Sequence, residues 1–504
     1  MSAYVLNLAV LVPLLGALLL LFIPRTRTQT IERCSVWISL APLLLSTLLW
    51  SGGSVLEARN GFAVDWLPAF HIRYSLGVDG FSIPMVFLTA VLSTVCLFYS
   101  AGRIKNRTRD YYFFMLLLEC FLIGVFCARD LFLFYVFFDA TLIPMYFLIA
   151  VWGGENRSRA ALKFILYTLA GSAALLIGIL WVYFRSVDVG HPSFDMAELA
   201  QLNLFYNLPK AQTVLFALFA AAFMVKIPLF PFHTWLPDAY VEAPSAVTAM
   251  LAGAMGKMGV YGFLRLAMPF FPEGAQHWAR TLVVLSVISI IYGALLALAQ
   301  SDLKRLVAYS SISHMGFIGL GLASATSAAQ SGLDQFASIA ISGVVFEMFG
   351  HGLIVGGLFL LIGWLGERAV ERDFRTLTGV MQTAPIYIVV FAAFMFASMA
   401  MPGLVGFWGE LYVLIGSFAV YRTATALSAI GIVVTAGFFV WALQRMAFGG
   451  ASPSAKKLHD VGPQELWSMG PLMGLIVLFG ILPHFFLSPW LGTVDILSQF
   501  LARR

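Results

Sequence analysis

The sequence predicts an all-α polytopic membrane protein with about fourteen transmembrane helices, arranged as two inverted five-helix repeats that each contain one broken helix. Composition predicts the membrane, because 60% of the 504 residues are hydrophobic and only 11% are charged. About fourteen apolar stretches come close to the ~20 residues that a helix needs to cross a bilayer. A soluble domain of this length carries far more charge, so the composition excludes that class.

The expected spans follow the apolar stretches in chain order. They cover residues 3–23, 33–51, 76–101, 111–127, 131–152, 161–185, 212–236, 243–268, 278–299, 303–325, 333–364, 382–417, 423–446 and 466–490. The predicted division of the chain is an N-terminal three-helix segment (1–110), a first repeat (111–270), a second repeat (271–448) and a C-terminal span (449–504).

Basic residues predict the orientation of these spans. Eighteen of the 30 Lys and Arg residues fall on one side of the predicted membrane, and ten fall on the other, which also holds both termini. By the positive-inside rule, the first side faces the cytoplasm or matrix. The basic charge therefore reflects topology and does not indicate nucleic-acid binding. Only Lys226 and Lys257 remain inside spans.

Two predicted spans are interrupted in the middle. Pro228 and Pro231 lie in the seventh span, and Pro402 with Gly403 lies in the twelfth. Proline removes a helix donor and clashes with the preceding turn, so both helices should break near mid-membrane. The breaks lie five spans apart, and an odd offset reverses the direction of the helix. This is the pattern of inverted repeats in transporters.

Ionisable side chains inside the spans are the candidate functional residues. They are Asp139, Lys226, Lys257, His314, His351 and Glu410. A charge at mid-membrane costs roughly 2.5 to 3.5 kcal/mol even on a lenient scale, so each requires a partner or a role. Burial disfavours the charged forms of carboxylates and lysines, whereas pairing favours them. The set predicts a proton path in which an Asp139–Lys226 pair opens and histidines pass the charge along.

The carboxylates and lysines also have structural interpretations. Asp139 and Lys226 could form a static buried ion pair that orients two helices. Lys257 could extend toward the membrane interface. Glu410 could cap the broken helix, since carboxylates favour helix N-termini. These alternatives stay open from the sequence.

The histidines and one further glutamate are also ambiguous. His314 and His351 could be hydrogen-bonded core histidines, and His233, near the end of its helix, fits a structural role better than a functional one. Glu347 precedes His351 by four residues and so shares its helix face. It is expected either to modulate that histidine or to shield it.

Five stretches of the chain resemble one family. They are Leu76-Gly77-Val78-Asp79-Gly80 and residues 144–150, 226–239, 301–306 and 313–317. Through these stretches the chain resembles the subunit M family of respiratory complex I, known in mitochondria as subunit 4, over residues 76–448. Glu410 supports this family within the antiporter-like superfamily, because the L and N subunits carry lysine at that point.

The resemblance implies a proton-pumping membrane subunit of NADH:quinone oxidoreductase with no redox chemistry and no cofactor of its own. NADH, FMN, iron–sulfur clusters and quinone would be bound by other subunits. The expected partners are the lipid bilayer and neighbouring antiporter-like subunits of the membrane arm. The expected location is a bacterial inner (plasma) membrane with both termini periplasmic, or the mitochondrial inner membrane.

Two residues depart from the family pattern. Asp139 replaces a glutamate, which shortens the reach toward Lys226 by one methylene, and Glu347 adds a carboxylate at an uncharged position. These departures leave other functions open: a subunit of a multi-chain Na⁺/H⁺ antiporter, a part of a proton-driven inorganic-carbon uptake complex, or an assembly scaffold without conduction.

Overall fold

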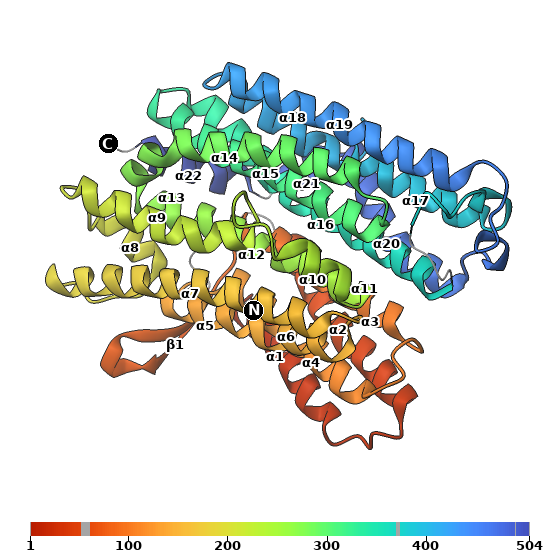
Figure 1. The fold of residues 1–504 in the computed structure, drawn as a ribbon. Coiled ribbons are helices and arrows are strands. Elements are labelled where there is room, and N and C mark those ends of the chain that lie inside the picture. Colours follow the sequence, from red (N-terminus) through yellow and green to blue (C-terminus); the bar gives the residue numbers. More distant parts are fainter. Residues whose placement is uncertain (1, 52–60, 369–372, 489, 503–504) are drawn as a thin grey trace.

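The computed structural model describes residues 2–51, 61–368, 373–488 and 490–502, and within them the chain is a bundle of long helices (Figure 1). Twelve of the described helices are long and apolar enough to cross a membrane. The helix α1 (Ser2–Leu20) and the interrupted pair α17 (Pro385–Ser398) and α18 (Val405–Phe418) are shorter and apolar. Together they account for the fourteen predicted spans, so the all-α polytopic fold is confirmed.

The N-terminal segment contains a β-hairpin that the sequence analysis missed. Its elements after α1 are α2 (Thr28–Ser51), β1 (Phe62–Leu67), the short 3-10 turn η2 (Pro68–Phe70), β2 (Ile72–Leu76) and α3 (Ser82–Ser100). The third span therefore begins at Ser82 and not at residue 76. The reason is local: Leu76 pairs in the hairpin, and the Asp79 carboxylate accepts hydrogen bonds from the Phe81 and Ser82 amides, which starts the helix there.

The next five spans include two irregular turns, both in the eighth span. The elements are α4 (Thr108–Cys127), α5 (Leu131–Ala140), α6 (Leu142–Trp152), α7 (Arg157–Asp188), α8 (Met196–Leu202), α9 (Pro209–Lys226), α10 (Leu236–Glu242), α11 (Ser245–Met250), η3 (Leu251–Met255), α12 (Lys257–Gly262), η4 (Phe263–Ala267) and α13 (Met268–Phe270). The segments η3 and η4 are π-helical turns within the eighth span. Such turns often occur at functional sites.

The second half of the chain contains four long helices, including the longest described one, α16 (Asp334–Arg368), with 35 residues. They are α14 (Pro272–Ala299), α15 (Leu303–Gln330), α16 and α19 (Arg422–Ala447), followed by α20 (Pro463–Ile481), α21 (Pro483–Leu487) and α22 (Leu491–Ala502), with 3-10 turns η5 (Val380–Gln382) and η6 (Ala455–Lys457) in loops. The last predicted span, 466–490, was too long. Its helix ends at Ile481, and Pro483 begins the separate short helix α21, at the first-turn position where proline is tolerated.

The seventh and twelfth spans are interrupted where the sequence placed the breaks. The helix α9 ends at Lys226, and residues 227–235, which include Pro228 and Pro231, form turns. In the twelfth span, residues 399–404 separate α17 from α18, and Gly403 there has a φ of 90°. The limits of the two five-helix repeats stay a prediction.

The helices differ in how much of their surface other helices cover. The eighth span, α15 and α16 are almost completely buried, whereas α2, α14 and α19 expose much of their apolar surface. In a bilayer, exposed apolar faces contact lipid, and polar side chains are placed on enclosed helices. The enclosed helices here carry Lys257, His314, Glu347 and His351.

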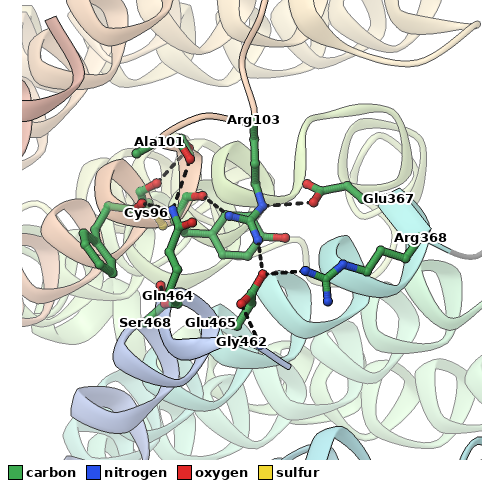
Figure 2. Close-up of polar contacts among 12 residues, drawn as sticks. Cys96, Ala101, Arg103, Glu367, Arg368, Gly462, Gln464, Glu465 and Ser468 are labelled. Atoms are coloured by element: carbon green, nitrogen blue, oxygen red, sulfur yellow. Dashed lines mark hydrogen bonds and ion pairs between the residues drawn. The ribbon is translucent and has the colours of Figure 1, made fainter. Parts of the chain in front are cut away.

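One end of the bundle holds the loops that were predicted to face the cytoplasm or matrix. Figure 2 shows Arg103, in the loop after α3, between Glu367 of α16 and Glu465 of α20. Arg103 Nη2 lies 2.6 Å from Glu465 Oε1, and Arg103 Nε lies 2.9 Å from Glu367 Oε2. Arg368 also contacts Glu465, at 3.1 Å. This ion-pair cluster joins the N-terminal segment, the second half and the C-terminal span.

Loops of the opposite predicted side meet at the other end. There, Arg265 of η4 forms an ion pair with Asp79, with Nη1 2.5 Å from Oδ2. Burial alone would raise the pKa of the Asp79 carboxyl, but the Arg265 guanidinium and hydrogen bonds from Ser82 hold that pKa below its usual value. The pair fixes the start of α3 to the end of the eighth span.

We expect Arg265→Ala to lower the free energy of unfolding by about 2 kcal/mol, because the Asp79 carboxylate would lose its charged partner while still largely buried. Unfolding in mixed detergent micelles measures the change. The matched control is Arg280→Ala, since Arg280 is exposed on α14. Equal stability of the two variants would contradict a structural role for the ion pair.

Candidate functional site

Lys257 and His351 form a direct hydrogen bond deep in the bundle. Lys257 Nζ lies 2.8 Å from His351 Nδ1 and donates to the Ala252 carbonyl at 2.7 Å. Lys257 is 1% exposed and His351 6% exposed. When Lys257 is an ammonium group, it has no acceptor capacity, so His351 Nδ1 must accept and its other nitrogen carries any proton of the neutral ring. A proton on Lys257 is therefore one hydrogen bond away from the imidazole.

A close approach of two backbones makes this hydrogen bond possible. A Cβ atom at Gly352 would lie 2.7 Å from the Gly253 carbonyl oxygen, and a Cβ at Gly253 would lie 3.0 Å from the Gly352 oxygen. Side chains at either position would force the eighth span and α16 apart. Gly253 precedes Lys257 by one helical turn, and Gly352 follows His351 directly, so the contact lies beside the lysine–histidine pair.

His314 on α15 lies between two carboxylates. Its Nδ1 is 3.2 Å from Glu410 Oε1 and 3.5 Å from Glu347 Oε1. Its Nε2 is 3.2 Å from the Ser398 hydroxyl, at the end of α17. The imidazole of His351 packs beside it, with ring centroids 5.4 Å apart. The order of contacts is Lys257, His351, His314 and then the carboxylates, with a hydrogen bond at the first step and ring packing between the two histidines.

A small cavity lies among these groups. Its lining includes His314, His351, Glu347, Glu410 and Ser398. Its volume of about 10 Å³ leaves room for about one water molecule. The Oε2 atom of Glu410 is buried and has no hydrogen-bond partner among the described residues. The cavity can therefore hold a single hydrogen-bonding bridge between the histidines and the carboxylates.

Asp139 and Lys226 do not form a hydrogen bond in the structure. The Asp139 carboxylate, at the end of α5, instead contacts the Ser172 hydroxyl of α7 at 2.5 Å and the Tyr135 hydroxyl at 3.2 Å. Lys226 Nζ is buried without a hydrogen-bond partner in the described chain and lies 4.9 Å from the centre of the Phe138 ring. The predicted pair is thus open, with Asp139 held by other groups.

The base of the Lys226 side chain packs against the part of the eighth span that carries Lys257. The Lys226 side chain lies against Gly259, where an added Cβ would come within 3.1 Å of Lys226 Cβ. Gly259 is on α12 together with Lys257. Transfer of a proton between the two lysines would require a bridging group or a side-chain movement, because Lys226 Nζ makes no hydrogen bond to any described residue.

Two other candidates lie apart from this line. His233 is 4% exposed, and its ring packs on Phe230 and Tyr292, with Nδ1 lacking a hydrogen-bond partner among described residues. Its surroundings are aromatic, and its role as a structural residue or a modulator stays a prediction. Glu119 of α4 was missed by the sequence analysis, although it is fully buried, near Ser93 of α3. The rule that identified Asp139, a carboxylate inside an apolar run, would also have identified Glu119.

The polar contacts of Asp139 and His314 were also not foreseen. Ser172, Tyr135 and Ser398 supply them, and each lies on a helix different from, or one turn away from, the ionisable residue. Hydroxyl side chains are common in membrane helices and usually bond to their own helix backbone. Their presence alone therefore gave no signal.

Residues 128–438 match the family of NADH:quinone oxidoreductase/Mrp antiporter transmembrane proteins. The chain belongs to this family, as its fold and its buried polar residues suggested. It is 37% identical over 484 residues to NADH-ubiquinone oxidoreductase chain 4 of Chondrus crispus, covering 95% of this chain and 94% of the relative. It is equally 37% identical to NADH-quinone oxidoreductase subunit M of Rhodobacter capsulatus over 490 residues, covering 95% and 93%.

A solved structure supports the same relationship. A chain of respiratory complex I from Thermus thermophilus with bound NADH superposes with a TM-score of 0.85 at 30% identity. The match covers 99% of this chain and 100% of that chain. The expected resemblance to complex I subunit M is therefore confirmed, and the chain is a multi-pass membrane subunit of that family.

We expect Ser172→Ala to let the Asp139 carboxylate move toward Lys226, because the variant removes its hydroxyl donor while the lysine stays the unpartnered cation nearby. A structure of the variant should show an ion pair with a nitrogen–oxygen distance below about 4 Å. The matched control is Thr168→Val on the same helix, whose hydroxyl bonds only within α7. An unmoved Asp139 in the Ser172 variant would show that the serine does not keep the pair open, and a Ser172→Ala/Tyr135→Phe double variant would then separate the tyrosine contact from the reach of the side chain.

Proposed function

We propose that this chain translocates protons as a membrane subunit of an NADH–quinone oxidoreductase. The observation that carries the proposal is the contact series from Lys257 through His351 to His314 and Glu410, on helices that other helices enclose. The relatives with similar length and sequence bear the names of NADH–quinone oxidoreductase subunits. An enclosed polar path and this kinship together favour a pump subunit over an assembly scaffold.

In the proposed path, Asp139 controls the protonation of Lys226. An approach of the Asp139 carboxylate would stabilise the ammonium form, and its withdrawal to Ser172 would leave an ammonium group without compensation in a low-dielectric site. The lysine would then release its proton toward Lys257, which passes it to His351 and His314. Glu410 would receive it from His314 Nδ1, 3.2 Å away.

The remaining parts of the activity belong to other subunits in this proposal. NADH, FMN, iron–sulfur clusters and quinone would be bound elsewhere, and this chain would carry out no redox chemistry. The loops around Arg103 and Arg368 would face the cytoplasm or matrix, and both termini would lie on the opposite side of a bacterial plasma membrane or a mitochondrial inner membrane.

We expect Lys226→Ala to reduce NADH-driven proton uptake by inverted membrane vesicles more than tenfold, since the path loses its entry cation. Assembly of the complex, measured on native gels, should be unchanged. The matched control is Lys210→Ala, since Lys210 is exposed at the other end of α9. Unimpaired uptake in the Lys226 variant would rule out the proposed role of this lysine, and uptake driven only by a sodium gradient would favour an antiporter.

Replacing Asp139 by glutamate should preserve proton uptake within about twofold, provided that the longer side chain can still reach both Ser172 and Lys226. The same vesicle assay measures the effect, with Asp139→Asn as the comparison that removes the charge at similar size. A loss as large for glutamate as for asparagine would mean that the site is built around the shorter side chain.

A further inference from the structure

We propose that Glu347 is a second proton acceptor for His314, able to replace Glu410. This inference rests on the proposed function and names a branch at the end of the path. The two carboxylates approach the same nitrogen from different helices, Glu347 from α16 and Glu410 from α18, at 3.5 and 3.2 Å. The distances differ by less than the movement that a side chain makes between neighbouring conformations.

The fold provides a built space for the Glu347 carboxylate. Gly409 of α18 lies against it, and a Cβ atom at Gly409 would lie 2.5 Å from Glu347 Oε2 and 2.9 Å from the Glu347 amide nitrogen. Any other residue at position 409 would displace the carboxylate. Glu347 is 2% exposed, and both it and Glu410 line the cavity that can hold one water.

The direct ion-pair contact of Glu347 is with His314, although its carboxylate also lies close enough to Lys257 to act on that lysine electrostatically. Lys257 Nζ already donates to Ala252 and contacts His351 Nδ1, whereas the ion-pair contact of Glu347 is with His314 Nδ1. Glu347 and His351 lie one turn apart on α16. His351 contacts Lys257, at the start of the contact series, whereas Glu347 contacts His314, at its end. A shield for His351 would instead contact that ring.

The transfer step is balanced for either acceptor. The Nδ1–H bond of the His314 imidazolium breaks and an O–H bond forms on one carboxylate. One positive and one negative charge are thereby converted into a neutral imidazole and a neutral carboxylic acid. Because Nδ1 carries only one proton, only one of the two carboxylates accepts in each step, and the other stays available. The unpartnered Oε2 of Glu410 and the cavity allow the bridge to form on either side.

The test compares four variants in the assembled complex: Glu347→Gln, Glu410→Gln, the double variant and Lys257→Ala. NADH-driven proton uptake by inverted vesicles is measured together with the amount of assembled complex. We expect each single glutamine variant to lower uptake by about two- to threefold and the double variant to lower it by more than about thirtyfold, beyond the roughly ninefold product of two independent threefold losses. Lys257→Ala should lose uptake completely.

The outcomes separate this inference from the proposed function. Loss of uptake in Glu410→Gln alone, equal to that in Lys257→Ala, would overturn the inference and leave the proposed path intact. Normal uptake in the double variant would also overturn it. Normal uptake in Lys257→Ala would overturn the proposed function itself. If the double variant fails to assemble, the Glu410→Gln variant decides. Its redox-induced infrared difference spectrum should retain a carboxylic-acid band. The frequency of that band should shift when Glu347→Asp is added to the Glu410→Gln variant, which assigns the band to residue 347.

Discussion

A charged side chain in the interior of a bilayer costs several kcal/mol unless protein surrounds it and supplies partners, and this cost organises the molecule. The eighth span, α15 and α16 are the most completely enclosed spans. They carry the buried side chains of Lys257, His314, Glu347 and His351. The spans with exposed surfaces, such as α2 and α19, present apolar side chains to lipid. In the bundle, helices with apolar outer faces thus surround the helices that carry the buried polar side chains.

Much of the fold was accessible from sequence, because membrane spans and proline breaks have strong local causes. The interruptions after Lys226 and after Ser398 lie where Pro228, Pro231 and Pro402 required them. The π-helical turn η3 has no such signature, since residues 251–255 contain no proline. The turn η4 lies just before Pro269, whose missing amide removes a helix hydrogen bond there. The hairpin was hidden for another reason: Leu76 continues an apolar run that looked like a helix start.

The candidate site was predictable in its members but only partly in its contacts. Lys257, His314, His351 and Glu410 could be selected individually because each is ionisable within an apolar stretch. The order in which they meet depends on tertiary packing, and the structure joins them in one series. The Asp139–Lys226 pair shows the limit: the hydroxyl of Ser172, more than thirty positions away in the sequence, holds Asp139 in place of the lysine. Nothing in the composition of α7 distinguishes this serine from those that bond to their own helix.

The proposed path depends on the absence of side chains at Gly253 and Gly352, which lets the two backbones approach closely. The lysine–histidine distance is set by two residues that have no side chain, no charge and no role in carrying a proton. A table of amino-acid similarity ranks glycine-to-alanine among the mildest exchanges, yet here the added methyl group would lie only 2.7 to 3.0 Å from the facing backbone oxygen. Replacing either glycine by alanine would therefore look like a mild exchange and would still separate the lysine from the histidine in the proposed path.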